Sequence, residues 1–325
     1  MGMARRQVFY QTDERGATLV SISIHSLLKE SDPNIPIAIY VAHNTRFSQA
    51  NCQDQIRKVV SRFAHATVKF ADFDPVFDKY RSDLFIKNVW WSSPIYAYCF
   101  FPELFPEIHG NLLYIDWDTL VTCDLEELFS MDLTTDGSVL AAVDEAPREE
   151  HVRLEPDWPA EAGNYFNNGV MVIDTEAWRR ENASDRIRIW YGKNRHRCRL
   201  IEQDATNVIL GSKTRHIPPK WNYCDNWLRR FRKFAPWSKC WYVYKPQDIL
   251  EAILNPRIIH FYGGKKPNIF THRPERRRFY RVMKELGLYH RPLPGETFLG
   301  HVEGVLFDIQ HFLLRTYARI LHLFI

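Results

Sequence analysis

The feature that most constrains the fold is the alternation of short apolar runs with helical segments near the start of the chain. Residues 8–10, 35–41 and 67–70 favour strands, whereas residues 19–29 and 50–63 favour helices. The run at 35–41 is almost entirely apolar, as is typical of a strand covered on both faces. This alternation predicts an α/β fold with a mainly parallel sheet. Ligand-binding groups of such a fold lie in loops at the carboxyl ends of its strands.

Composition and charge narrow the function classes. The chain has 325 residues, of which 45% are hydrophobic and 25% charged, as expected for a folded globular protein of one large or two small domains. Residues 261–325 hold 11 Lys/Arg and 5 Asp/Glu, whereas the first 260 residues hold 32 and 34. Because the positive balance is confined to the C-terminal fifth, we expect no nucleic-acid partner. Six scattered cysteines without CxxC spacing and the lack of an apolar signal core predict a cytoplasmic chain with reduced thiols.

Two aspartates follow the buried strand predicted over residues 111–115. Asp116 and Asp118 stand one residue apart, and in an extended chain such side chains point the same way, so both can reach one divalent cation. A turn with two solvated aspartates would give the same pattern. The strand before them and the strand-like residues 119–121 after them favour the metal site.

Two further motifs are polar. Asn167 and Asn168 precede a glycine and the strand predicted over 170–174, either as a simple turn or as amides that hydrogen-bond hydroxyl groups. Residues 202–204 read Glu-Gln-Asp and open a helix predicted over 205–210, where carboxylates are stabilised and also serve as N-caps. Taken alone, neither motif separates a structural role from a functional one.

The segment 258–267 combines a strand, a glycine turn and two lysines. His260 is either an ordinary buried histidine or a ligand that closes a metal site. Gly263 and Gly264 would let the backbone approach a phosphate, and a lysine such as Lys266 would supply a point charge. No GxGxxG and no Walker glycine loop occurs, so neither a dinucleotide fingerprint nor a P-loop is expected.

Together these motifs resemble glycosyltransferase family 8, the retaining, metal-dependent enzymes that include bacterial lipopolysaccharide glucosyl- and galactosyltransferases and glycogenin. The resemblance covers most of residues 8–270 and implies a GT-A fold, a Rossmann-like nucleotide-sugar domain, which we place at residues 1–270. It rests on five motifs in the family's order: Asp116-Trp117-Asp118, Phe166-Asn167-Asn168-Gly169, Glu202-Gln203-Asp204, Pro218-Pro219-Lys220-Trp221-Asn222 and His260-Phe261-Tyr262-Gly263-Gly264-Lys265-Lys266-Pro267.

The resemblance implies a metal and phosphate site. Asp116, Asp118 and His260 would be the ligands of Mn²⁺, with Mg²⁺ as the alternative. Mixed carboxylate and imidazole ligation suits such an ion better than it suits a thiolate metal. Lys266 and the amides near Gly263 would hold the phosphates of a UDP-sugar, whose developing charge the ion would neutralise.

The resemblance also assigns roles around the donor. Asp13, after the first strand, matches a position that contacts the uridine, and Glu202 matches a contact to the donor sugar. Asn167, Gln203 and Asp204 match groups around the reacting sugar and are the expected catalytic residues. Because the amide of Gln203 is a poor nucleophile, the resemblance favours same-face transfer with retention, in which the leaving phosphate deprotonates the acceptor. We expect the Gln203 carbonyl to stabilise the oxocarbenium-like transition state.

Two departures from the family pattern concern the donor. The family usually has Tyr-Ala-Arg before the metal strand, whereas this chain has Tyr98 in place of the arginine. Glu202 stands where the family more often has Asp. The expected activity is transfer of glucose or galactose from a UDP-sugar to a carbohydrate acceptor. The alternatives are a catalytically weak or silent nucleotide-sugar binding protein and, in another class, a metal phosphohydrolase, for which the amide motifs have no evident use.

Residues 271–325 form the predicted basic and amphipathic helical extension. Arginines gather between residues 272 and 284, and charges throughout the last helix exclude a spanning segment. This helix either packs on its own domain or lies on an anionic membrane surface, at the inner face, where a glycolipid acceptor would be found. Its apolar residues at helical spacing are Val302, Val305, Ile309, Phe312, Leu313, Ile320 and Phe324.

Overall fold

The computed structural model describes residues 6–86, 92–145, 165–224, 244–264 and 266–322. The chain divides into two compact units. Unit 1 comprises residues 1–17, 31–117 and 125–217, and unit 2 comprises residues 18–30, 118–124 and 218–325. The domain boundary that we place at residue 270 stays a prediction.

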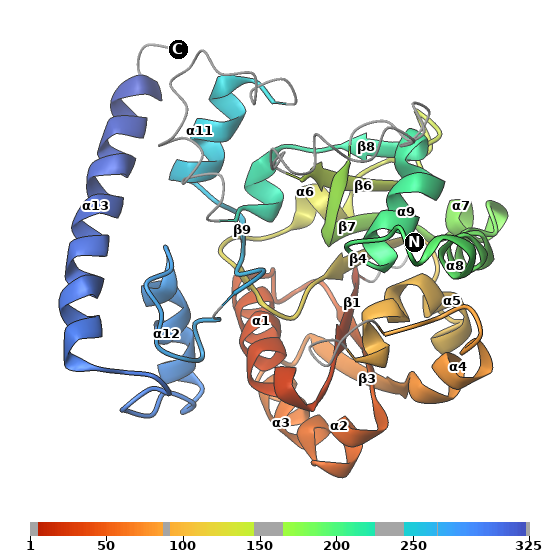
Figure 1. Ribbon diagram of the computed structural model, residues 1–325, viewed down its shortest axis with the longest axis horizontal. Coiled ribbons are helices and arrows are strands. Elements are labelled where there is room, and N and C mark those ends of the chain that lie inside the picture. The colour runs from red at the N-terminus through yellow and green to blue at the C-terminus, as the bar shows by residue number, and fades with distance from the viewer. Residues whose placement is uncertain (1–5, 87–91, 146–164, 225–243, 265, 323–325) are drawn as a thin grey trace. The chain divides into compact units, whose positions relative to one another are not determined.

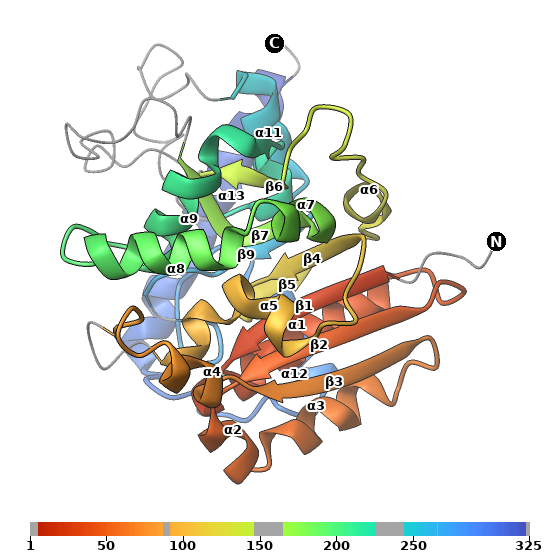
Figure 2. The same ribbon diagram turned by 90° about the vertical axis from the view of Figure 1, so that its right-hand side faces the viewer.

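Unit 1 is built on a seven-stranded sheet. Its neighbours pair in parallel, except that β7 is antiparallel to both β4 and β6. The mainly parallel α/β sheet is therefore confirmed, and Figure 2 shows β3, β2, β1 and β4 side by side. The strand order is β3 (Ala66–Asp72), β2 (Ile37–His43), β1 (Arg6–Thr12), β4 (Asn111–Ile115), β7 (Phe166–Asp174), β6 (Leu140–Asp144) and β8 (Thr214–His216).

The helices of unit 1 are short and bury one side each. In α3, for example, Ile56, Val59 and Val60 are buried while the charged residues face solvent. The helical elements are η1 (Glu14–Gly16), α2 (Thr45–Gln49), α3 (Cys52–Val60), α4 (Asp74–Lys79), η2 (Ser93–Phe100), α5 (Phe101–Leu104), α6 (Glu126–Phe129), α7 (Thr175–Arg180), α8 (Ala183–Asn194), α9 (Glu202–Leu210) and η4 (Gly211–Lys213).

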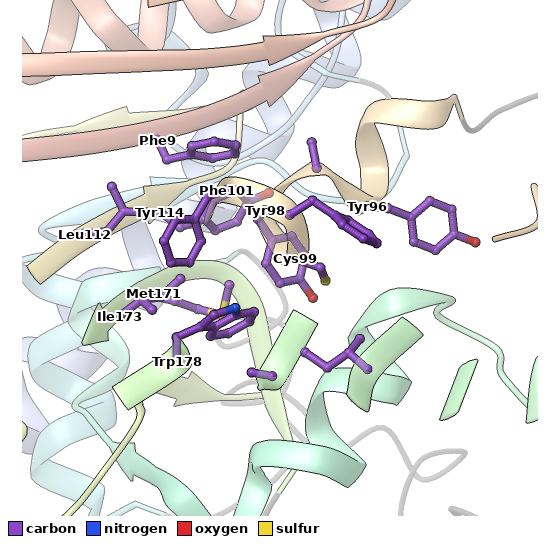
Figure 3. Packing of buried hydrophobic residues seen from close by; sticks show 14 of the residues in the cluster. Phe9, Tyr96, Tyr98, Cys99, Phe101, Leu112, Tyr114, Met171, Ile173 and Trp178 are labelled. Atoms are coloured by element: carbon purple, nitrogen blue, oxygen red, sulfur yellow. The ribbon is translucent and has the colours of Figure 1, made fainter. Parts of the chain in front are cut away.

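Aromatic side chains fill much of the core of unit 1. The segment η2–α5 supplies Tyr98 and Phe101, which pack over Tyr114 of β4 and Trp178 of α7 (Figure 3). The ring centroids of Tyr98 and Tyr114 are 5.1 Å apart. These large buried rings contribute much of the apolar area that stabilises the unit, which accounts for the high aromatic content of the chain.

Unit 2 contains a small two-stranded sheet and the C-terminal helices. In that sheet β5 and β9 are antiparallel, with Thr119 opposite His260. Unit 2 holds all but the first residue of α1. Its elements are α1 (Ala17–Glu30), β5 (Thr119–Val121), η5 (Pro219–Asn222), α11 (Pro246–Leu254), β9 (Ile258–His260), α12 (Arg276–Glu285) and α13 (Phe298–His322).

The predicted C-terminal helix is present as α13, the long blue helix of Figure 1. Among the described helices, none combines the length and the apolar character needed to cross a bilayer. The helix packs within unit 2, but not through the large apolar residues that define its periodicity. Those that the structure describes are 48–64% exposed: Val302, Val305, Ile309, Phe312, Leu313 and Ile320.

Candidate functional site

The pairing of β5 with β9 brings Asp118 and His260 together. Asp118 immediately precedes β5, His260 ends β9, and Thr119 lies opposite His260 in the register. The backbone N–H of Phe261 donates to the carbonyl of Asp118 at 2.9 Å, which extends the ladder by one bond. The Nε2 atom of His260 consequently lies 3.1 Å from Oδ1 of Asp118, and both side chains are buried.

Asp118 is a buried carboxylate in contact with an ammonium group and an imidazole ring. The ammonium of Lys266 contacts its Oδ2 atom and also donates to the carbonyl of Phe261 at 2.9 Å. Burial alone would raise the pKa of the Asp118 carboxyl, but Lys266 and His260 outweigh burial and hold that pKa well below its usual range. Asp118 is therefore an anion at neutral pH despite its burial.

The residues predicted to hold a metal fit one. Asp116, Asp118 and His260 each offer one ligand atom, and these three atoms lie within 4.8 Å of one another. Two carboxylates and one imidazole form a donor set that suits Mn²⁺ or Mg²⁺. The phenol of Tyr114 donates to the Asp116 carboxylate, which orients it at the end of β4.

The glycine turn after β9 needs its glycines. Gly263 has φ +66° and Gly264 has φ +31°, in the left-handed region that side-chain-bearing residues rarely adopt. The turn brings the chain back so that Lys266 reaches the carbonyl of Phe261. The expectation that amides near Gly263 bind phosphate stays a prediction.

The predicted catalytic residues Asn167 and Gln203 lie in unit 1, at β7 and at the start of α9. Nδ2 of Asn167 donates to Glu145 at 2.7 Å, and Nε2 of Gln203 donates to the phenol of Tyr165 at 3.0 Å. Oε1 of Gln203 accepts the backbone N–H of Asn168 at 3.2 Å. The structure thus joins both residues in one amide-rich network.

One sequence expectation in this region is wrong in detail. The strand predicted over 170–174 begins earlier, at Phe166, so of the two alternatives for Asn167 and Asn168 the simple turn does not occur. Their side of the ladder is irregular, since the β6–β7 register shifts between Ala142 and Val143. An irregularity of this kind allows consecutive polar residues inside a strand. The alternation of apolar and polar residues, on which strand prediction depends, does not show where such a shift occurs.

Glu202 is a buried carboxyl group in this network of unit 1. Its Oε1 atom accepts a hydrogen bond from Nδ2 of Asn168 at 3.0 Å, and its Oε2 atom has no partner among the described residues. Burial raises the pKa of Glu202 to about 8, and the carboxylates of Asp116 and Asp204 add to the effect. The group is therefore largely a neutral carboxylic acid at pH 7.

Asp204 acts on the loop before α9. Its Oδ2 atom accepts the backbone N–H of Arg199 at 2.5 Å and that of Leu200 at 2.9 Å, while Oδ1 accepts the phenol of Tyr165 at 2.6 Å. These bonds secure a strained backbone, because the β-branched residue Ile201 has φ 47° and ψ −112°. The helix start and its side chains are thereby held in one arrangement.

Asp13 caps η1 at the end of β1. Its carboxylate accepts the backbone N–H groups of Arg15 and Gly16, Nε of Arg15 at 2.9 Å and Oγ of Ser92 at 2.8 Å. The same carboxylate is buried at the carboxyl end of a parallel strand, where ligand groups are expected. Its contact to uridine stays a prediction.

Three residues of the site carried no role in the sequence reasoning. Glu145 stands directly after β6, so the rule that strand ends carry ligand groups would have pointed to it. Tyr165 precedes β7 and had no distinguishing pattern. Asn222 belongs to a motif noted in the sequence, and its Oδ1 atom lies 2.9 Å from Nδ1 of His260.

The comparisons with known proteins agree with this geometry. The chain is 30% identical over 176 residues to general stress protein A of Bacillus subtilis (strain 168), an alignment that covers 53% of this chain and 58% of that protein. It is 28% identical over 178 residues to lipopolysaccharide 1,2-glucosyltransferase of Escherichia coli (strain K12), covering 54% and 49%. The chain thus spans about half the length of these two curated relatives.

Solved structures share the fold. The crystal structure of the galactosyltransferase LgtC in complex with donor and acceptor sugar analogues matches with a TM-score of 0.67 and 17% identity, covering 88% of this chain and 98% of that one. At that identity the likeness establishes the GT-A fold alone. Residues 7–267 match the family described as "Glycosyl transferase family 8". This match covers well over half of the sequence, and the chain therefore belongs to glycosyl transferase family 8.

Proposed function

We propose that this protein is a metal-dependent hexosyltransferase that moves glucose or galactose from a UDP-sugar to a glycan or glycolipid acceptor with retention of configuration. Family membership supports the reaction class. The observation that carries the proposal is the buried Asp118 carboxylate with His260 and Lys266 on it. A divalent ion bound by Asp118 and His260, beside the ammonium group of Lys266, would suit a diphosphate leaving group.

The metal and phosphate half of the site would act on the leaving group. A divalent ion bound by Asp116, Asp118 and His260 would neutralise charge that develops on the diphosphate. Lys266, which neutralises Asp118 in this structure, would turn to a phosphate oxygen when the ion takes over that role. Mn²⁺ is the proposed ion, with Mg²⁺ as the alternative.

The amide-rich network of unit 1 would act on the sugar. The bond between the anomeric carbon and the phosphate oxygen breaks, the acceptor oxygen bonds to the same face, and its proton passes to the leaving phosphate. Gln203 keeps a lone pair on Oε1 beside the bond from Asn168, so its carbonyl dipole can stabilise positive charge at the anomeric carbon. Asn167 and Glu202 would hydrogen-bond hydroxyl groups of the sugar. Asp204 would hold the start of α9 in place, and Asp13 would contact the uridine.

A second candidate function is a catalytically silent nucleotide-sugar binding protein. It is favoured by Tyr98, whose buried hydroxyl forms hydrogen bonds with Thr206 at 2.7 Å and with Asn168 at 3.2 Å. A tyrosine used in this way supplies no positive charge to a donor. Turnover distinguishes the two functions.

The test is release of UDP from a panel of UDP-sugars with and without Mn²⁺, using Asp118→Asn as the inactive control. Metal-dependent release that the variant loses supports the transferase and identifies the donor. Binding of UDP and Mn²⁺ without any turnover would favour the silent binder, and release of free phosphate instead of UDP would favour a phosphohydrolase. An acceptor in a glycolipid would place the enzyme in the cytoplasm at the inner face of the membrane.

A further inference from the structure

The most exposed apolar surface of the described residues lies on α13. Leu299, Leu306, Leu313 and Ile320 repeat every seven residues and are 73%, 63%, 60% and 49% exposed. Val302 and Ile309 lie beside this row on the helix surface and are also exposed. We call this set, with the exposed apolar residues that adjoin it on the helix, the apolar face of α13. A soluble monomer rarely leaves such a continuous stripe uncovered.

The opposite side of α13 packs against other residues of unit 2 and so determines which side of the helix faces solvent. Gly300 and Gly304 are buried there, and a Cβ atom at Gly300 would lie only 2.7 Å from the ring of Phe270. Asp308 accepts a hydrogen bond from Arg276 of α12 at 2.6 Å, and Arg315 donates to the carbonyl of Leu254 at the end of α11 at 2.6 Å. Small residues, a partly buried ion pair and a hydrogen bond to a backbone carbonyl thus hold the helix against the rest of unit 2, with its large apolar residues turned outward.

We propose that the apolar face of α13 docks on an anionic lipid surface. At the helical angle per residue this face spans an arc of roughly 140° that contains no charged residue, wider than the seam of two paired helices. The helix is 25 residues long, or about 37 Å, and can lie in the plane of the interface with its apolar side among the acyl chains.

Charge selects the lipid surface over a second copy of the chain. Residues 261–325 hold 11 basic and 5 acidic residues, and Arg277, Arg281 and Lys284 of α12 are exposed. Two copies that met through α13 would bring these positive segments together, whereas anionic headgroups complement them. This surface would keep the enzyme where a lipid-linked sugar acceptor is found.

Sedimentation of the full chain with vesicles tests the proposal. Wild type should bind vesicles of phosphatidylcholine and phosphatidylglycerol in equal parts, bind more weakly at high salt, and bind pure phosphatidylcholine poorly. Leu306→Glu combined with Leu313→Glu should lower the partition coefficient by at least about tenfold, because two apolar contacts are lost and two like charges are added. Both positions are exposed, so the fold should persist.

The matched control is Phe85→Glu combined with Ile189→Glu, two exposed apolar residues of unit 1. It should bind the anionic vesicles as wild type does. Failure of wild type to bind anionic vesicles, or equal loss in both double variants, would overturn the proposal. So would a wild-type dimer in analytical ultracentrifugation that the α13 variant dissociates while neither protein binds vesicles.

A second inference concerns the imidazole of His260. Its Nδ1 atom lies 2.9 Å from Oδ1 of Asn222, which is itself buried at the end of η5. The backbone of the next residue, Tyr223, brackets β9, since its N–H donates to Ile258 and its carbonyl accepts the N–H of His260 at 2.7 Å. Asn222 is therefore held in place by main-chain bonds on a neighbouring segment.

We infer that Asn222 is a positioning residue for the metal site. A carbonyl oxygen only accepts, so Nδ1 of the His260 ring keeps its proton, and Nε2, the ring atom turned toward Asp118, is the one left to bind a metal. A ligand ring fixed in this tautomer binds a metal without rearrangement. This inference rests on the proposed metal site.

The test is Mn²⁺ affinity, measured by electron paramagnetic resonance, together with the nitrogen chemical shifts of His260 in metal-free protein. Asn222→Leu should weaken Mn²⁺ binding by about 10- to 100-fold, and Asn222→Asp, which keeps the acceptor, should restore most of it. The ring tautomer should become mixed in the Leu variant alone. Unchanged affinity and tautomer in Asn222→Leu would overturn the inference while leaving the metal site intact. Failure of wild type to bind Mn²⁺ would overturn both.

Discussion

Glu202 in unit 1 and Asp118 in unit 2 are two deeply buried carboxyl groups in opposite electrostatic surroundings. Glu202 is 5% exposed and Asp118 is 3% exposed, so burial disfavours the charged form of both. Burial raises the pKa of Glu202 to about 8, and the nearby carboxylates of Asp116 and Asp204 act in the same direction, against an amide donor from Asn168. Burial has the same tendency at Asp118, but Lys266 and His260 reverse it and lower the pKa.

The difference separates two kinds of chemistry. The surroundings of Glu202 are rich in amides, and such groups recognise hydroxyls by paired donors and acceptors. The surroundings of Asp118 are charged, and such groups recognise a metal ion and phosphates. A nucleotide sugar presents both kinds of group, which is why the contrast supports the proposed donor.

The largest expected effect comes from removing the cation of the Asp118 cluster. Lys266→Met should lower turnover by about 10²- to 10³-fold, because charge on the leaving diphosphate loses a preorganised partner. Steady-state UDP release measures it. Lys29→Met is the matched control, since Lys29 forms an ion pair with Glu285 in the same unit at 2.9 Å and should leave turnover unchanged. Full activity of Lys266→Met would remove the phosphate role from this cluster.

The next effect concerns the amide half of the site. Gln203→Ala should lower kcat by about 10²-fold with a smaller change in the KM for the donor, because the carbonyl acts only when charge develops. Gln55→Ala, which removes an amide in another hydrogen bond, should have no such effect. A change in KM alone would reduce Gln203 to a binding group.

Much of the fold was predictable because it depends on local patterns. The strand at residues 111–115 ends where its apolar run ends, and the aspartates after it follow from that boundary. The opposition of Thr119 and His260 was not predictable, because nothing local in either segment specifies its partner. The two aspartates could be proposed as metal ligands from their spacing after the strand, whereas the choice of His260 as their partner rested on the family resemblance.

The outward face of α13 shows a second feature that the sequence could not predict, namely which side of the helix is packed. Periodicity identified the large apolar residues but suggested packing on the domain as readily as on a membrane. The structure packs the helix through Gly300, Gly304 and Ala318, which are buried. Small side chains allow close approach of a helix to its neighbours, yet they carry little weight in an apolar pattern. The packed side was therefore invisible to hydrophobicity alone.

A pH-dependent effect sharpens the comparison between the two carboxyl groups. The native pKa of Glu202, about 8, lies above its ordinary value of 4.5, so the folded state binds the proton more tightly. Stability from this group is fully present at low pH and is lost as pH rises through the native value. Glu202→Gln, which stays neutral, should be more stable than wild type by about 2 kcal/mol above roughly pH 8, once local relaxation is allowed for.

Urea unfolding in a chelating buffer between about pH 5 and about pH 9 measures this difference. The gap between Glu202→Gln and wild type should widen steadily as pH rises. Glu176→Gln is a control, because that carboxylate is exposed at the surface and hydrogen-bonded to His109. A gap that does not change with pH would show that Glu202 is ionised in the folded protein, and the contrast with Asp118 would disappear.

The smallest expected effect tests whether Tyr98 is structural. Tyr98→Phe removes a buried hydroxyl that bonds to Thr206 and Asn168, and Asn168 keeps its bond to Glu202 at 3.0 Å. The cost should be about 1 kcal/mol of unfolding free energy, measured in urea, with turnover nearly unchanged. Because the ring is packed against Tyr114, the variant keeps the core volume. A large loss of turnover without loss of stability would instead bring the Tyr98 hydroxyl into donor recognition, and the amide-rich network of unit 1 would then include a group in contact with the sugar.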